Sequence, residues 1–145
     1  MAARMLPWAV LLPVLKRLLP LPRLVRLMWA EPTESRPPPE RDDVLALANT
    51  LTRLLPLPSS GNCLARSLLA YRYLARGGFD PTLAVGISLP ENGTPAGHAW
   101  IELAGAPMRE PGGVAHFTRV VAFASGGSMQ LETSDVTIPP ASCIH

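Results

Sequence analysis

A chain of 145 residues is long enough for one domain with a sizeable core and too short for two independent linked domains. A hydrophobic content of 48% with 17% charged residues excludes a disordered chain, and a formal net charge of +2 lacks the strong basic excess of a nucleic-acid-binding protein. The two cysteines, Cys63 and Cys143, cannot form a disulfide framework, so we expect free thiols in a reducing, cytoplasmic compartment.

Residues 1–30 combine an apolar run, "MAARMLPWAVLLPVL", with basic residues that recur just after it. The early arginine is typical of a signal peptide, but prolines interrupt the run and no small-residue cleavage site follows. The run is also shorter than the roughly 20 apolar residues that a membrane-spanning helix needs. We therefore expect a helical appendage of short amphipathic helices packed on the domain, and a basic segment that contacts a membrane surface is the alternative.

Residues 31–43, "EPTESRPPPERDD", read as an exposed proline-rich connector, which leaves residues 44–145 as the main domain. Helical spacing resumes in "DDVLALANTLTRL", where two aspartates favour the first turn, and Pro56 and Pro58 stop the helix. A second helix is predicted in "GNCLARSLLAYRYLARGGF", residues 61–79, which two glycines close.

The second half of the chain has the alternation of strands. "TLAVGIS" and "HAWIEL" are predicted to pair across the turn "PENGTPAG", and "AGAP" is predicted to close a second hairpin. "AHFTRVVAF" and "SMQLETSDVTI" are predicted to continue the sheet. Helices followed by an antiparallel sheet make the predicted fold α+β.

Cys63 heads the second predicted helix, directly after Asn62, which is among the best N-cap residues. A helix N-terminus has unpaired amides and a positive dipole end, and both favour the thiolate form of a cysteine. The thiolate is the nucleophilic form. Cys63 is therefore a candidate nucleophile, and an apolar cysteine buried under the helix start is the alternative.

A nucleophilic thiol needs a base and the base needs an orienting acid. His98, on a predicted strand, is the candidate base, with His116 and His145 as alternatives. Glu110 is the candidate acid because the second hairpin brings it beside His98, and Glu102, on the same strand as His98, is its competitor.

The segments "NCLARSLLAYRYLARGGFDPTLAVGIS" and "GHAWIELAGAPMRE" together resemble the lasso-peptide biosynthesis B2 proteins, over about residues 44–125. These are leader-peptide-cleaving members of the transglutaminase-like cysteine protease superfamily. The resemblance implies a papain-like α+β core in which Cys63, His98 and Glu110 take the nucleophile, base and acid positions. It implies no cofactor and no metal.

The resemblance also implies the reaction and its partners. The enzyme would hydrolyse one peptide bond of a ribosomally made precursor through a thioester, and a separate ATP-using cyclase, itself a candidate partner, would close the macrolactam. A separate B1 protein would bind the leader peptide and deliver the precursor. The backbone amide of Cys63 would be one oxyanion donor, and Asn62 and the serines of "PSSGN" are candidates for the second.

Two other functions fit the same residues. A transglutaminase-like acyl transferase would form the same thioester and pass it to an amine instead of water. A non-enzymatic zinc module would use Cys63, His98, Cys143 and His145 as ligands, but only the last two are close in sequence, and structural zinc sites usually draw on close pairs.

Overall fold

The computed structural model of the chain describes residues 1–33, 39–54, 62–91, 93–110 and 113–132. Within these residues the helices precede the strands, in the order α1 (Ala2–Leu18), α2 (Leu21–Met28), α3 (Arg41–Leu54), α4 (Asn62–Arg76), β1 (Pro81–Ser88), β2 (Ala96–Leu103), β3 (Ala106–Pro107), β4 (Thr118–Phe123), the short 3-10 helix η2 (Ser125–Gly127) and β5 (Met129–Leu131). The fold is α+β, as the sequence predicts.

Helix α4 is the centre of the hydrophobic core, because it contacts all three other helices and strands β1 and β2. Nine of its side chains are buried, and seven of these pack in one cluster with residues of α1, α2, α3 and the sheet. Its last turn ends where Gly78 takes a φ of 85°. The amides of Gly78 and Phe79 then bond the carbonyls of Ala75 and Leu74, which is a Schellman motif.

The first two helices belong to this same core. Six of their side chains are buried in it, namely Met5, Ala9, Leu12, Leu24, Val25 and Met28. Polar contacts also join α1 to α4: the Tyr73 hydroxyl donates to the Arg4 carbonyl, and the Arg72 guanidinium lies 4.1 Å from the centroid of the Trp8 ring. Residues 1–30 therefore contribute buried side chains to the same core cluster as α3, α4 and the sheet.

Helix α1 runs through Pro7 and Pro13, although proline in a helix interior costs about 3 kcal/mol. The buried side chains of α1 supply the compensating contacts. Helix α3 begins at Arg41, within the predicted connector, and has Asp42 and Asp43 in its first turn, where they complement the helix dipole.

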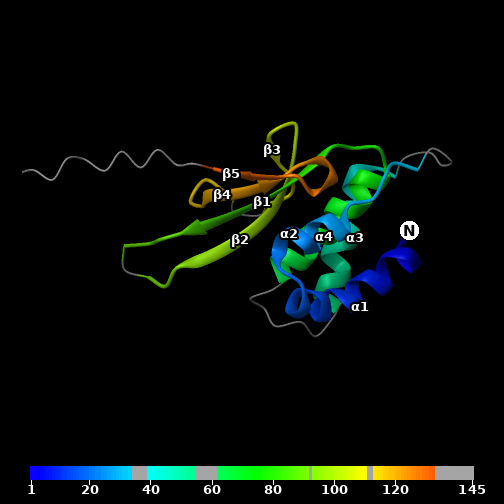
Figure 1. Ribbon diagram of the computed structural model, residues 1–145, viewed down its shortest axis with the longest axis horizontal. Helices are drawn as coiled ribbons and strands as arrows, with labels where there is room; N and C mark the ends of the chain where they lie inside the picture. The colour runs from blue at the N-terminus through cyan, green and yellow to red at the C-terminus, as the bar shows by residue number, and fades with distance from the viewer. Residues whose placement is uncertain (34–38, 55–61, 92, 111–112, 133–145) are drawn as a thin grey trace, which may run out of the picture.

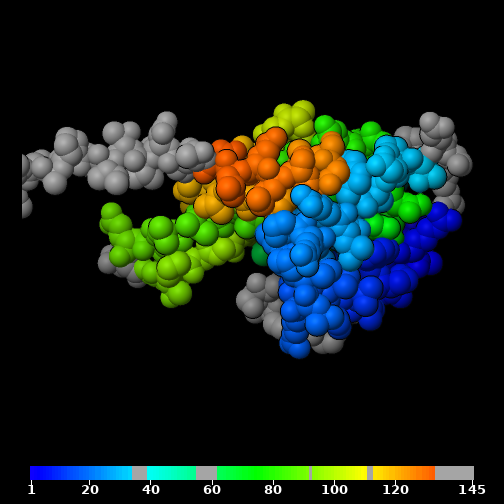
Figure 2. Space-filling model, in the orientation of Figure 1, coloured from blue at the N-terminus to red at the C-terminus, as the bar shows by residue number. Residues whose placement is uncertain are grey.

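The sheet has the strand order β3-β2-β1-β4-β5, with every neighbouring pair antiparallel. Figure 1 shows the sheet beside the helices, with the far ends of β1 and β2 extending away from them. In the space-filling view these ends form an arm that projects from the main body (Figure 2). The β2–β3 turn has positive φ at both Ala104 (51°) and Gly105 (78°), as a two-residue type I′ hairpin requires.

The predicted strands appear with shifted ends. β2 begins at Ala96, earlier than "HAWIEL", and β4 begins at Thr118, so His116 lies in a turn and not on a strand. The predicted last strand is described only as Met129–Leu131, and its continuation past residue 132 lies outside the described residues.

Candidate functional site

Cys63 lies in the first turn of α4, with a free and partly buried thiol. It lines an open pocket of about 480 Å³ whose other walls come from α2, α4, β1 and residues 95–99 before and on β2. His98 lines the same pocket. The fold therefore brings the two predicted residues, 35 positions apart in the sequence, to one cavity.

Asn62 does not cap α4 through its side chain as predicted. The structure places it inside the helix as the first residue, and its Oδ1, the atom that a cap would use, is buried with no hydrogen-bond partner among the described residues. Backbone amides of the first turn have no partner within an α-helix. The Asn62 side chain, next to Cys63 in the sequence, therefore has an unused acceptor within the described part of the chain.

Lys16, near the end of α1, interacts electrostatically with Cys63. Burial lowers the pKa of its ammonium group, and the negative charge of a Cys63 thiolate acts in the opposite direction. Together with Leu21, which lines the pocket, Lys16 shows that the N-terminal region contributes to the surroundings of Cys63. The sequence gives no signal for this contribution.

The His98 ring is fixed by an acid and by aromatic rings. Its Nε2 lies 2.8 Å from Oε2 of Glu110. The Phe117 ring stacks on it with centroids 4.9 Å apart, and the Trp100 ring lies further away at 6.0 Å. Phe117 is a residue that sequence reasoning missed, because its position next to His98 depends on the path of the chain between β3 and β4.

Glu110 is a buried carboxylate with both oxygens engaged. Its side chain is 7% exposed; Oε2 contacts His98, and Oε1 accepts a hydrogen bond of 2.8 Å from the Arg66 guanidinium. Arg109, just before it, has a φ of 47°, an unusual backbone conformation for a residue other than glycine. Glu110 and its two partners, His98 and Arg66, form a set of contacts that we call the His98 network.

Glu102, the competing acid, contacts other partners. Its Oε1 accepts from Nε1 of Trp100 at 2.9 Å, and its Oε2 accepts from Arg119 at 2.7 Å. Arg119 also binds Glu132. We call Glu102, Trp100 and Arg119 the Trp100 network. Between the two glutamates, the structure places Glu110 against the imidazole.

The geometry leaves one ring nitrogen of His98 for chemistry. Nε2 is taken by Glu110, whereas Nδ1 has no hydrogen-bond partner among the described residues. The thiol and the imidazole share the pocket, but the described residues show no hydrogen bond between them. Catalytic hydrogen bonds are often long in a substrate-free site and tighten only when substrate binds.

The remaining predicted residues are placed as follows. His116 lies exposed in the turn before β4 with its ring against Phe117, whereas Cys143 and His145 lie outside the described residues. Within the described ranges, no group of three or more potential metal ligands comes together. No helix in the described part of the chain is long and apolar enough to span a membrane.

A comparison with protein families agrees with this architecture. The model of a family described as the transglutaminase-like superfamily matches residues 2–122, which includes both α1 and the whole region from Cys63 to Glu110. No curated protein and no solved structure matches the chain.

Proposed function

The chain belongs to the transglutaminase-like superfamily, and we propose that it is a cysteine peptidase that removes the leader peptide from a ribosomally made lasso-peptide precursor. The family match supports thiol-based peptidase or acyl-transfer chemistry. The choice of a leader peptidase rests on the resemblance of residues 44–125 to the B2 proteins.

One observation carries the proposed chemistry: His98 is bound through Nε2 to the buried Glu110, in the pocket that also contains Cys63. A carboxylate on one ring nitrogen holds the imidazole in a defined tautomer and stabilises its cation. The other nitrogen can then exchange a proton with the thiol or with the substrate. This is the division of roles in a Cys-His-acid triad.

The reaction follows from these positions. The Cys63 thiolate attacks the scissile carbonyl carbon, and a new C–S bond forms as the carbonyl electrons move to oxygen. When the C–N bond breaks, His98 gives its proton to the departing amine, which leaves a thioester. His98 then takes a proton from water as the water oxygen attacks the thioester carbon. The Cys63 thiolate leaves, and the leader peptide is released with a free carboxyl terminus.

The developing oxyanion needs hydrogen-bond donors near the start of α4. The Cys63 backbone amide is one candidate, because it lies in the first turn, where intrahelical acceptors are lacking. The Asn62 side chain, whose Nδ2 group is a hydrogen-bond donor next to Cys63 in the first turn, is a candidate for the second donor.

The precursor itself and a separate leader-binding B1 protein are the proposed partners, and the lasso cyclase would act on the product. Delivery by the B1 protein would raise the effective concentration of precursor and mainly lower the apparent KM. We place the activity in a reducing compartment such as the cytoplasm, where a nucleophilic thiol persists.

The test is mass spectrometry of a precursor incubated with the full chain, with and without the B1 protein. We expect a single cleavage whose two products together have the mass of the precursor plus one water. This cleavage should be lost in Cys63→Ala. Cys143→Ala is the matched control and should cleave normally. Transfer of the acyl group to an added amine in preference to water would instead favour the acyl transferase. Loss of cleavage in a folded Cys143→Ala variant would contradict the assignment of Cys63.

A further inference from the structure

A second pocket, of about 390 Å³, lies between α3, α4 and the residues that follow β3. It is separate from the Cys63 pocket, and Glu110 lies between the two: the carboxylate lines the second pocket and also contacts His98, which lines the first. Apolar side chains form part of its wall, namely Leu45 from α3, Ile101 from β2 and Met108 from the residues after β3.

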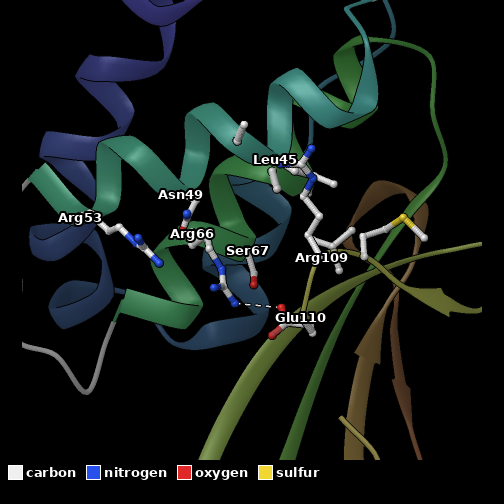
Figure 3. A pocket seen from close by; sticks show the side chains of 11 residues that line it. Leu45, Asn49, Arg53, Arg66, Ser67, Arg109 and Glu110 are labelled. Carbon is white, nitrogen blue, oxygen red and sulfur yellow. Dashed lines mark hydrogen bonds and ion pairs between the residues drawn. The ribbon is translucent and has the colours of Figure 1, made fainter. Parts of the chain in front are cut away.

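Arginines dominate the polar part of this pocket. Arg53 comes from α3, Arg66 from α4 and Arg109 from the residues after β3 (Figure 3). Glu110 is the one acidic residue in the lining, so the described wall has an excess of positive charge. Asn49 adds a neutral amide between the arginines (Figure 3).

The three guanidinium groups differ in how far the fold already uses them. Arg66 is 23% exposed and is bonded to Glu110. Arg109 is 54% exposed and only loosely paired with the exposed Asp42, at 3.6 Å. Arg53 is exposed and forms no ion pair with a described residue. Two cations at the pocket are therefore available to a ligand.

Available guanidinium groups are complementary to a carboxylate, and an apolar wall beside them is complementary to the short aliphatic stem that carries it. We propose that this pocket binds an acidic side chain, glutamate or aspartate, of a peptide. The proposal that this peptide is the substrate rests on the proposed peptidase function, but binding at the pocket does not. Arg53 and Arg109 would supply the positive charge that attracts the carboxylate, and the apolar wall would contact its methylene groups.

A ligand in this pocket would change the electrostatic environment of His98. Arg66 is the only arginine of the pocket that Glu110 binds among the described contacts, and the Arg66–Glu110–His98 chain consists of two contacts of 2.8 Å each. A carboxylate drawn toward the guanidinium groups would alter the electrostatic environment of that chain. We therefore expect the NMR signals of the His98 ring to shift when the pocket is filled.

The experiment is an NMR titration of the full chain with capped glutamate, N-acetyl-glutamate N-methylamide, and with the matching capped glutamine. We expect the glutamate probe to bind about tenfold more tightly than the glutamine probe, the equivalent of one charge-assisted hydrogen bond. The difference should shrink at about 0.5 M salt, where exposed charges are screened. The shifted signals should come from the pocket and from His98.

Variants make the test specific. Arg53→Gln and Arg109→Gln should each weaken binding of the glutamate probe by about threefold, so that the two together account for the tenfold preference, and both should leave the glutamine probe unaffected. Arg17→Gln is the matched control, because Arg17 is exposed on α1 and outside the pocket. If Arg109→Gln alters the fold through its unusual backbone, Arg53→Gln on the surface of α3 still decides the question.

Two results would overturn the proposal: equal affinities for the two probes at low salt, or glutamate binding that survives both pocket substitutions. These outcomes are distinct from failure of the proposed function. A chain that binds the glutamate probe but cleaves no precursor would contradict the peptidase and leave the pocket proposal intact. A chain that cleaves precursor but does not distinguish the probes would do the reverse.

Discussion

Two buried glutamates near β2 have the same kind of partners, yet they belong to different kinds of site. Glu110 binds Arg66 and the imidazole of His98, whereas Glu102 binds Arg119 and the indole of Trp100. An imidazole takes up and releases protons near neutral pH, but an indole N–H only donates a hydrogen bond. The aromatic partner therefore separates a network that can do chemistry from one that can only hold the sheet together.

The surroundings of the two networks support this difference. The His98 network lies between two pockets, one containing Cys63 and the other lined by arginines. The Trp100 network connects β2 to Arg119 on β4 and then to Glu132 after β5, and Trp100 is only 2% exposed. We therefore expect changes in the first network to affect the reaction and changes in the second to affect the free energy of unfolding.

Replacing the two aromatic partners should give the largest contrast. We expect His98→Ala to lower kcat/KM by about 10³- to 10⁴-fold, because it removes proton transfer to and from the reacting groups. Trp100→Phe should keep most of the activity and lose about 1–3 kcal/mol of unfolding free energy, because Glu102 loses a buried hydrogen bond. Cleavage rates and urea unfolding of both variants measure this. A fully active His98→Ala variant would remove His98 from the mechanism.

Replacing the two glutamates should give the same contrast between activity and stability, but with a smaller difference in activity. We expect Glu110→Gln to lower kcat/KM by about 10²-fold, because orienting the imidazole contributes less than its proton transfer. Glu102→Gln should change kcat/KM only a few-fold and should mainly reduce stability. Steady-state kinetics of the two variants, matched in folding by circular dichroism, decide this. A greater loss of activity in Glu102→Gln would place the functional acid on the strand of His98.

Local sequence patterns predicted much of the framework on which these networks are built. Helical spacing and the glycine pair predicted α4 and its end, and alternation with the "AGAP" turn predicted the β2–β3 hairpin. The same hairpin reasoning led to Glu110 as the neighbour of His98, and the structure shows that contact. These features depend on residues close together in the sequence, so periodicity and turn chemistry suffice to find them.

Features that depend on distant contacts were not predictable in this way. Arg66 precedes Glu110 by 44 residues, and an arginine on a helix carries no local sign of a buried partner. The prolines of α1 argued for broken helices, but packing against α4 outweighed that local preference. The Asn62 side chain suited a cap by residue type, yet its Oδ1 makes no hydrogen bond with any described residue.

Gly86 is the point at which both networks can be disturbed by one methyl group. It pairs with His98 on β2 and with Arg119 on β4. A Cβ at this position would lie 2.7 Å from the Thr118 carbonyl oxygen and 2.9 Å from the Trp100 ring. We expect Gly86→Ala to cost about 1–3 kcal/mol of unfolding free energy and to lower activity about tenfold through displacement of the neighbouring strands. Gly105→Ala is the control for activity: a Cβ there meets no neighbour within 4 Å, so this variant should lose stability through its φ of 78° but keep its activity.

The two arginines should give the smallest and most specific contrast. Arg66 touches Glu110 and not His98, so we regard it as a positioning residue that keeps the carboxylate in place. We expect Arg66→Gln to lower kcat about fivefold with KM nearly unchanged for a precursor whose acidic residues have been replaced by glutamine, because an interaction that matters only in the transition state changes kcat and not KM. That choice of substrate keeps the arginine pocket out of the measurement. Arg66→Lys should recover part of the loss, since it restores the charge without the planar fork of the guanidinium group.

Arg119→Gln should leave kcat unchanged and lower the unfolding free energy by about 1–2 kcal/mol, because it removes charged hydrogen bonds from Glu102 and Glu132. Equal effects of Arg66→Gln and Arg119→Gln on kcat, after correction for stability, would mean that Arg66 has no positioning role specific to the His98 network, and the distinction between the two networks would then rest on His98 and Glu110.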